Sequence, residues 1–596
     1  MNQLKRLLPY YTPYRGELIM GLSLVVISTA LTAGIPWFLR LAIDGLRAGR
    51  PAPEIWRLAG SIVAVAALAG FLRYAMREIL NGVSRRIEFD LRNDLFSHLV
   101  TLDATWFGTQ RTGDLMARLT NDLNAVRMAA GPAVMYLMNT IAGAVFSLVF
   151  MLRIDALLTL LALLPMIALP VITARLGKLV HKRFDAVQEH FSTLTTHAQE
   201  NLSGTRIVRA YRQEGAEIER FAALNEEYKR RNMSLARLYG TMHPLFAFLA
   251  GIAGVVVLGA GGLLTLRGTI SVGSFVAFGL YLNLLTWPLI ALGWVINLFQ
   301  RGSASLARLA EILDQQSSII DPPIEASVHL PPVVGGRSLE FRGVGFHFPT
   351  PAGREPRWIF RNVSFVVPAG ATLGIVGATG SGKTALMDLI PRLHDPQEGS
   401  ILIDGVPIRD IPLHELRREI GFVPQESLLF SETIGSNLGY GAADHDSVEW
   451  SARTAQLAET IEGFPGGYET MLGERGINLS GGQKQRASLA RALARRPSVI
   501  LLDDALSAVD THTEAAILRG LREALTERTA VIASHRASAI RDAAWIIVLD
   551  EGSVVEQGKH DDLMAAEGKY WSLLRRQQLV ESIESQPVTS AIPSHE

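Results

Sequence analysis

The sequence predicts an α-helical membrane domain of six spanning helices with long cytoplasmic extensions, followed by a soluble α/β domain. Composition gives the first indication, because 48% of the 596 residues are hydrophobic and the mean hydropathy is +0.22, as expected for a chain that is half embedded in lipid. The distribution of apolar residues gives the second indication. Stretches long enough to cross a bilayer lie in the first half, and short apolar runs between Gly-rich and charged segments follow them.

Each of the six apolar stretches can form a spanning helix of about 20 residues. The sequence between the third and the fourth stretch is very short, which predicts a tight turn between two antiparallel helices. The stretches cover residues 18–42, 58–72, 129–152, 156–174, 244–266 and 272–298.

The connections between these stretches are unequal in length. Those at 44–54, 153–155 and 267–271 are short, whereas those at 73–128 and 175–243 are long and rich in arginine. The positive-inside rule therefore predicts that the two long connections lie in the cytoplasm, together with the amino terminus and the soluble domain. Any single arginine there is explained equally well by an ordinary solvated helix face, so the prediction depends on the asymmetry between the loops.

Charge and cysteine content exclude several classes of protein. The 57 basic and 57 acidic residues cancel, so no net positive charge indicates nucleic-acid binding. The absence of cysteine excludes disulfides, thiolate metal sites and cysteine nucleophiles. Residues 1–17 are basic and aromatic and lack a cleavage site, which predicts an interfacial helix and not a signal peptide. Helical spacing of apolar residues over 77–102 and 178–201 predicts that membrane helices continue tens of Å into the cytoplasm.

A complete P-loop stands in the second half, between an apolar strand at 372–376 and a helix that starts near Ala385. Its glycines allow the backbone to wrap phosphates, Lys383 reaches the outer phosphates, and the Thr384 hydroxyl is suited to Mg²⁺. The nucleotide-binding residues predicted here are Gly377, Ala378, Thr379, Gly380, Ser381, Gly382, Lys383 and Thr384.

About a hundred residues later, the motif LSGGQ opens a basic helix. A hydroxyl and small residues before that helix predict an anion site at its positive end. The apolar run 499–502 shows no alternation, which is typical of a parallel strand buried on both faces, and it delivers Asp503 and Asp504 at its carboxyl end. The residues of the LSGGQ site are Ser480, Gly481, Gly482 and Gln483.

A P-loop combined with LSGGQ resembles the ATP-binding-cassette (ABC) ATPases, and the resemblance extends over nearly the whole chain. The segments 107–115 and 204–211 are similar to the two intracellular loops of ABC exporters, whose tips act as coupling helices that dock on the ATPase domains. The resemblance implies that Arg111, Asp122 and residues 214–221 touch those domains. The segment 473–476 resembles a further element of exporters that contacts the coupling helices.

The same resemblance implies functional roles around ATP and Mg²⁺. Asp503, Thr384 and Gln425 would hold the metal, and Asp504, His535 and Gln425 would act in catalysis. Phe348 would stack on adenine, although a sheet-edge aromatic is its plainer interpretation, and a structural role is the alternative for His535. The loop 507–510 matches the segment that crosses the dimer.

The function implied is ATP-driven export of amphipathic or hydrophobic compounds (drugs, lipids or peptides) by half of a dimeric transporter in the bacterial inner membrane. Most family members have Glu where this chain has Asp504, and the shorter side chain withdraws the carboxylate by about 1 Å. This favours a heterodimer with a second ABC half-transporter, in which the site at this P-loop is slow; a homodimer is the alternative. An importer with the exporter fold, of the siderophore type, and an ATP-gated channel or regulator are the other readings.

Changes in composition predict the domain boundaries. Ser, Pro and Gly separate the two domains, and the carboxyl-terminal end is polar. The predicted parts are an interfacial helix (1–17), a transmembrane domain with two intracellular loops (18–315), a linker (316–337), a nucleotide-binding domain (338–578) and a disordered tail (579–596).

The predicted topology is open to test by single cysteines, which have no background in this chain. Arg50→Cys and Thr269→Cys should react with a membrane-impermeant maleimide added outside intact cells, and Arg111→Cys should react only after permeabilisation, because the short loops lie outside. Modification of Arg50→Cys from the cytoplasmic face alone would overturn the topology.

Overall fold

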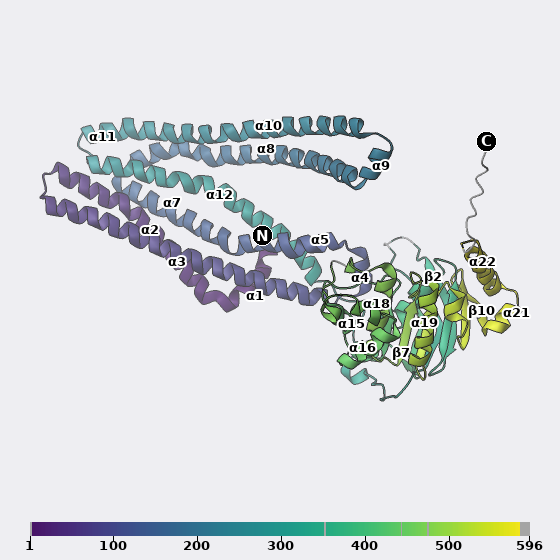
Figure 1. Cartoon of the computed structure of the whole chain (residues 1–596). Coiled ribbons are helices and arrows are strands. Elements are labelled where there is room, and N and C mark those ends of the chain that lie inside the picture. The colour runs from purple at the N-terminus through teal and green to yellow at the C-terminus, as the bar shows by residue number, and fades with distance from the viewer. Residues whose placement is uncertain (1–2, 351–352, 354, 443, 474–475, 585–596) are drawn as a thin grey trace, which may run out of the picture. The chain divides into compact units, whose positions relative to one another are not determined.

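The protein is described by a computed structural model that covers residues 3–350, 353, 355–442, 444–473 and 476–584 (Figure 1). It consists of two compact units. The first comprises Met1–Val100 and Thr112–Gln315, and the second comprises Thr101–Arg111 and Gln316–Glu596. The short segment Thr101–Arg111 therefore belongs with the second unit, although it lies within the sequence of the first.

The first unit is helical throughout, and each predicted span lies within one of six long, nearly uninterrupted helical runs. Within the described residues, four of these runs (Gln3–Arg47, Ala52–Leu99, Thr112–Ile154 and Glu214–Leu266) are long and apolar enough to cross a membrane, and the other two have shorter apolar portions. The elements are η1 (Gln3–Leu7), α1 (Leu8–Tyr11), η2 (Thr12–Tyr14), α2 (Arg15–Arg47), α3 (Ala52–Leu99), α5 (Thr112–Ala117), η3 (Arg118–Asp122), α6 (Leu123–Met128), η4 (Ala129–Ala133), α7 (Val134–Ile154), α8 (Ala156–Ser203), α9 (Thr205–Ala210), α10 (Glu214–Val256), η5 (Val257–Gly261), α11 (Gly262–Leu266) and α12 (Val272–Leu313).

Side chains at the short connections start the helices that follow them. Asp155 is the N-cap of α8 and accepts a hydrogen bond from the Leu158 amide at 2.7 Å. Ser271 is the N-cap of α12 and accepts from the Ser274 amide at 3.0 Å. Each cap satisfies a backbone donor that has no partner within its own helix, so the chain can reverse direction within a few residues.

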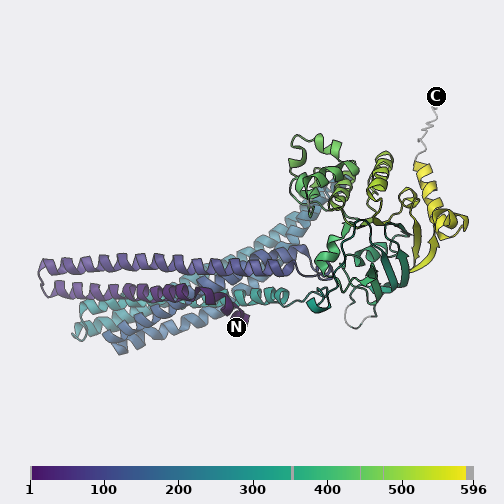
Figure 2. The same ribbon diagram turned by 90° about the horizontal axis from the view of Figure 1, so that it is seen from below.

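Helices of the first unit pack as neighbouring pairs. Helices α2 and α3 lie side by side (Figures 1 and 2), and α8 pairs with α10 in the same way. One apolar cluster, which includes Val25, Leu80 and Met135, joins α2, α3 and α7. A second cluster joins α7, α8, α12 and the end of α10, and it includes Met151 and Phe278.

The run from α5 to α7 carries two π-helical segments, η3 and η4, where it packs against α12. The backbones approach closely here, because a Cβ atom built on Gly302 of α12 would lie 2.2 Å from Ala129 Cβ. At η3 the buried carboxylate of Asp122 accepts hydrogen bonds from Ser305 at 2.8 Å and from Arg308 Nε at 2.9 Å. Asp122 thus bonds to α12 within its own unit.

The hairpin of α8 and α10 carries the short helix α9 at its tip. Asn201 of α8 donates to the Glu217 carboxylate of α10 at 2.8 Å, and the buried ring of His197 lies 3.3 Å from the same carboxylate. Glu217, within the segment 214–221, thus helps to hold the two arms of the hairpin together.

The second unit contains two sheets. In the first, antiparallel strands run in the order β2-β1-β4-β5; in the second, the order is β10-β9-β3-β8-β7-β6, and only β10 is antiparallel to its neighbour. The strands are β1 (Leu339–His347), β2 (Trp358–Val367), β3 (Thr372–Gly377), β4 (Glu398–Ile403), β5 (Val406–Pro407), β6 (Ile420–Val423), β7 (Val499–Asp503), β8 (Thr529–Ala533), β9 (Trp545–Asp550) and β10 (Ser553–Gly558).

Strand β7 shows why the second sheet is an interior one. Ile500 and Leu502 belong to the apolar cluster formed with the helices, whereas Val499 and Leu501 belong to the cluster between the two sheets. All five residues of β7 are buried, which confirms the prediction of a strand covered on both faces.

The helices of the second unit include one element from far upstream, α4, and helix α22 at the carboxyl-terminal end. Tyr570 and Leu574 of α22 belong to the apolar core, and the helix runs on to Glu584; residues 585–596 of the expected tail lie outside the described residues. The helices are α4 (Ala104–Thr109), η6 (Ile324–Ala326), α13 (Lys383–Leu389), α14 (Leu413–Arg418), α15 (Ile434–Leu438), α16 (His445–Thr454), α17 (Ala458–Glu462), η7 (Gly467–Glu469), α18 (Gly481–Ala494), α19 (Thr511–Ala524), α20 (Ala537–Ile540), α21 (His560–Ala565) and α22 (Lys569–Glu584).

The bond between Asp122 and α12 predicts a measurable loss of stability. Asp122→Asn should lower the free energy of unfolding of the first unit by about 1.5–3 kcal/mol, because it removes charge-assisted hydrogen bonds to a buried carboxylate. The measurement is thermal unfolding of the detergent-solubilised protein. Asp114→Asn is the matched control, since its side chain is 52% exposed in its pair with Arg118 and should contribute less than about 1 kcal/mol. Equal losses in the two variants would contradict this role.

Candidate nucleotide site

Three adjacent parallel strands bring the predicted site residues to one edge of the sheet. Strand β8 lies between β3 and β7, and its last residue, Ala533, pairs with Ile375 of β3 and with Asp503 of β7. The carboxyl ends of all three strands therefore meet, which is where open α/β sheets bind their ligands.

The P-loop follows β3 and depends on its glycines. Gly380 and Gly382 have φ values of 84° and 100°, which side chains with a Cβ atom rarely adopt. A Cβ atom on Gly377 would lie 2.4 Å from the Leu549 carbonyl oxygen, so this position requires glycine because of a close approach. The loop is thus shaped by its backbone, as a phosphate cradle must be.

Lys383 is buried at the start of α13 and points back into the loop. Its Nζ donates hydrogen bonds to the carbonyl oxygens of Gly377 at 2.8 Å and Ala378 at 3.0 Å. Burial lowers the pKa of Lys383, and the nearby carboxylates of Asp503 and Asp504 act in the opposite direction. The ammonium group lies inside the loop, beside two carboxylates.

Thr384 and Asp503 meet below the loop. Burial raises the pKa of Asp503, and the nearby Thr384 hydroxyl acts in the opposite direction. Among the described residues, no group bonds to the buried Oδ2 of Asp503 or to the buried Oγ of Ser381. A buried carboxylate oxygen without a partner, next to a hydroxyl, suits a hard cation such as Mg²⁺, which takes oxygen ligands.

Asp504 begins the turn after β7. It is half-buried, has a φ of 48°, and its amide donates to the Ala533 carbonyl at 2.8 Å. Aspartate tolerates this left-handed conformation better than most residues. His535 is exposed, two residues after β8, and its charge favours the ionised form of Asp503, so the two side chains are near each other.

Gln425 lies exposed just beyond β6, the strand next to β7. It thus belongs to the same edge of the sheet as the Asp503 carboxylate. The structure brings the P-loop, Asp503, Asp504 and His535 together and places Gln425 at the border of this group.

The LSGGQ residues form a complete capping box at the start of α18. Ser480 Oγ accepts from the Gln483 amide at 3.3 Å, and Gln483 Oε1 accepts from the Ser480 amide at 2.8 Å. A Cβ atom on Gly482 would lie 2.7 Å from the Ala508 carbonyl oxygen. Within the part of the chain that the structure describes, residues 480–483 make no hydrogen bond or ion pair with the P-loop.

The loop 507–510 is held between α18 and the turn after β8. Gln485 of α18 donates to Ser507 Oγ and accepts from the Ala508 amide, each at 2.8 Å. Arg536, next to His535, donates to the Ser507 and Val509 carbonyl oxygens. The loop 507–510 therefore connects α18 to the turn that carries His535.

Phe348, after β1, is 46% exposed. Its ring and those of Phe346 and His394 meet in edge-to-face pairs, at centroid distances of 5.0 and 5.5 Å. A half-exposed aromatic residue fits both the adenine-stacking and the sheet-edge interpretation.

Two residues at this site were not predicted from the sequence. Burial, with the nearby Asp503, raises the pKa of Asp388 to about 6. Asp388 lies four residues after Thr384 on α13, so helical spacing from the P-loop could have indicated it. His394, beside Phe348, carries no motif signal.

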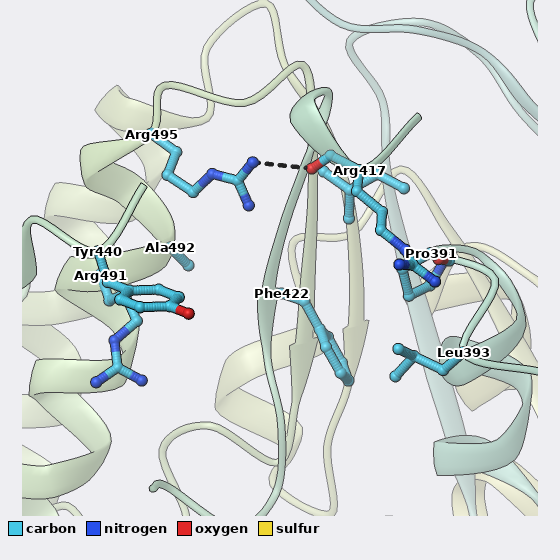
Figure 3. Close-up of a pocket in the computed structure, with 9 residues that line it drawn as sticks. Pro391, Leu393, Arg417, Phe422, Tyr440, Arg491, Ala492 and Arg495 are labelled. Atoms are coloured by element: carbon cyan, nitrogen blue, oxygen red, sulfur yellow. Dashed lines mark hydrogen bonds between the residues drawn. The ribbon is translucent and has the colours of Figure 1, made fainter. Parts of the chain in front are cut away.

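A cavity of about 190 Å³ lies beside β6 and is shown in Figure 3. Its wall is mainly apolar and aromatic, with arginines at the rim, and Arg495 donates to the Arg417 carbonyl at 3.0 Å. The residues that line it are Pro391, Leu393, Arg417, Ile420, Phe422, Tyr440, Arg491, Ala492 and Arg495.

Comparison with known proteins identifies the family. The pattern of the ABC transporter transmembrane region matches residues 18–289, and that of the ABC transporter ATPase matches residues 360–507. The "Probable multidrug resistance ABC transporter ATP-binding/permease protein YheI" of Bacillus subtilis is 36% identical over 97% of this chain and 98% of its own length. The "Multidrug resistance-like ATP-binding protein MdlA" of Escherichia coli is 35% identical over 95% of each chain, and the "ATP-dependent lipid A-core flippase" of Syntrophus aciditrophicus is 33% identical over 96% and 94%.

A bacterial Atm1-family ABC exporter, solved with ATP bound, has a TM-score of 0.75 and 29% identity over 94% of this chain and 98% of its own. The fold and the sequence agree along the whole length. The chain therefore belongs to the ABC transporter family, has the fold of its exporters, and is an ATPase that couples hydrolysis to transport across a membrane.

Proposed function

We propose that this chain is one half of a dimeric exporter that uses ATP and Mg²⁺ to move amphipathic or hydrophobic compounds, such as drugs, lipids or peptides, out of a bacterial cell by alternating access. The observation that carries the proposal is that one chain holds one helical unit and one ATPase unit whose P-loop and LSGGQ do not meet. The relatives named for multidrug resistance and for lipid A-core flipping support export of such compounds.

In this proposal the P-loop amides and Lys383 bind the phosphates, and Thr384, Asp503 and Gln425 hold the metal. Mg²⁺ supplies charge neutralisation on the phosphates during hydrolysis. Asp504 orients the attacking water, and His535 contacts the terminal phosphate. Because burial raises the pKa of Asp503, its ionised form is favoured most when a cation faces its unpartnered oxygen.

The second chain completes the site with its own LSGGQ. The capping box supports this role, because it uses the Ser480 and Gln483 groups locally and leaves the amides of Gly481 and Gly482 uncapped within the described residues. A positive helix end with free amides is suited to the phosphates of a nucleotide held by the opposite P-loop.

The tip helix α9 is the element that we assign to docking on the partner's ATPase unit. Ile207 of α9 is 66% exposed, and Tyr211, the residue that follows the helix, is 74% exposed. The apolar cavity lined by Phe422 and Tyr440 offers a surface of matching character. Docking there would bury the exposed side chains of both partners.

The pair Asp503-Asp504 favours a heterodimer. LSGGQ is intact here, whereas the water-orienting side chain, Asp504, is one methylene shorter than Glu. In an asymmetric exporter, one chain supplies an intact LSGGQ and the other supplies the catalytic glutamate. This chain's LSGGQ then completes a competent site on the partner's P-loop, and its own P-loop forms a slow site. A homodimer in which Asp504 suffices is the competing assembly.

Lys383→Ala should abolish nucleotide binding at this chain's P-loop, because no other ammonium group lies within the loop to follow the phosphate charge. Photolabelling with an azido-ATP analogue and ATP-driven uptake of a fluorescent amphiphile into inside-out vesicles are the measurements. Lys559→Ala, on the exposed surface, is the control. A Lys383→Ala protein that labels as strongly as the parent would refute the P-loop assignment, and ATP-driven loss of the amphiphile from these vesicles would refute export.

Asp504 gives a second test. The chain purified alone should hydrolyse ATP slowly, and Asp504→Glu should speed its turnover by up to about a hundredfold, because the longer side chain restores roughly 1 Å of reach. In the assembled pair, Asp504→Asn should change turnover far less than removal of the partner's glutamate. The heterodimer is excluded by a homodimer with brisk, substrate-stimulated turnover that Asp504→Asn abolishes.

A further inference from the structure

Helix α4 is anchored to the ATPase unit by specific polar contacts. Its N-cap, Asp103, accepts hydrogen bonds from the Ser318 amide at 2.7 Å and the Ser318 hydroxyl at 2.8 Å, at the start of the linker. Two residues further, Thr105 Oγ1 lies 2.8 Å from His394 Nδ1. The first intracellular helix thus bonds both to the linker and to a side chain of the α/β domain.

His394 lies between this helix and the aromatic residues beside the P-loop. Its ring meets the Phe348 ring edge to face at 5.5 Å and packs against Phe346 at 5.6 Å. Burial lowers the pKa of His394, with Asp103 acting in the opposite direction. The Nδ1 atom of a neutral imidazole can accept a hydrogen bond from the Thr105 hydroxyl while the ring packs against Phe348.

These contacts form a continuous chain from Thr105 through His394 to the half-exposed ring of Phe348. Two edge-to-face contacts limit where that ring can lie, and the hydrogen bond limits where the imidazole can lie. Displacement of α4 must therefore disturb the Phe348 ring, unless the hydrogen bond breaks first.

We propose that His394 is a positioning residue that links the base-stacking ring of Phe348 to the intracellular helix α4. The proposal rests on the nucleotide site described above. Linkage is reciprocal: if α4 holds the ring in place for a base, then base binding stabilises the position of α4 by the same free energy. The position of the first intracellular loop would thereby depend on whether the adenine base is bound, and not on the phosphates alone.

The test separates base recognition from phosphate recognition. The full-length protein in lipid nanodiscs is titrated with TNP-ATP, which is then displaced by ATP or by inorganic tripolyphosphate, a probe without a base. Thr105→Val should weaken ATP binding by about two- to tenfold, the value of one hydrogen bond, and leave tripolyphosphate binding unchanged. Thr105→Ser, which retains the hydroxyl, should restore parental affinity.

Thr109→Val is the matched control, because Thr109 is an exposed threonine of the same helix whose hydroxyl donates to the Trp106 carbonyl oxygen and accepts from the neighbouring Gln110 side chain, away from His394. His394→Phe, which keeps an aromatic ring and loses the nitrogen, should weaken ATP binding as Thr105→Val does. The double variant should be no weaker than either single variant, since the two changes remove one shared contact.

The outcomes distinguish this inference from the proposed function. If Thr105→Val equals Thr109→Val, or if it weakens ATP and tripolyphosphate alike, or if the effects of Thr105→Val and His394→Phe add, the link through His394 is refuted. If the parental protein binds TNP-ATP no more strongly than Lys383→Ala does, the nucleotide site itself is refuted. If His394→Phe fails to fold, the comparison of Thr105→Val with Thr105→Ser and Thr109→Val tests the link through His394.

Discussion

Burial of the parallel strands on both faces is the constraint on which the rest of the ATPase unit depends. Strands β3, β7 and β8 have apolar side chains packed against helices on one face and against the antiparallel first sheet on the other. Polar residues cannot lie along such strands without losing their hydrogen bonds. Chemistry is therefore confined to the strand ends, and the carboxyl ends of these three strands carry the P-loop, the aspartate pair and the turn with His535.

Confinement also sets the electrostatics of the site. Burial raises the pKa of Asp503 and brings that of Asp388 to about 6, and it lowers the pKa of Lys383. Each pKa shift means that burial disfavours the charged form of the side chain. A bound nucleotide with its metal would favour the charged forms, because its phosphates would face the ammonium group and its cation would face the carboxylates. The site is in this sense preorganised for a ligand that carries both signs of charge.

Periodicity and local motifs predicted the long helices, the buried strands and the order of the P-loop, LSGGQ and Asp503, because each depends on residues close together in the sequence. The contacts of Asp122 and His394 could not be predicted in this way. Asp122 lies in a π-helical segment that packs against α12, and its partner Arg308 is 186 residues away in the sequence. His394 meets Thr105 only because α4 packs with a domain that begins about two hundred residues later.

The length of the helices has a mechanical consequence. Helix α8 has 48 residues, which corresponds to roughly 70 Å at 1.5 Å per residue. A rod of that length tilted by about 1° moves its far end by roughly 1 Å. Displacements of about 1 Å are enough to change the rate at a catalytic site by roughly a hundredfold. Asn201 and Glu217 join α8 and α10 near the tip of the hairpin. If the pair stays rigid, a small tilt of its apolar end therefore displaces the tip by a distance of this order.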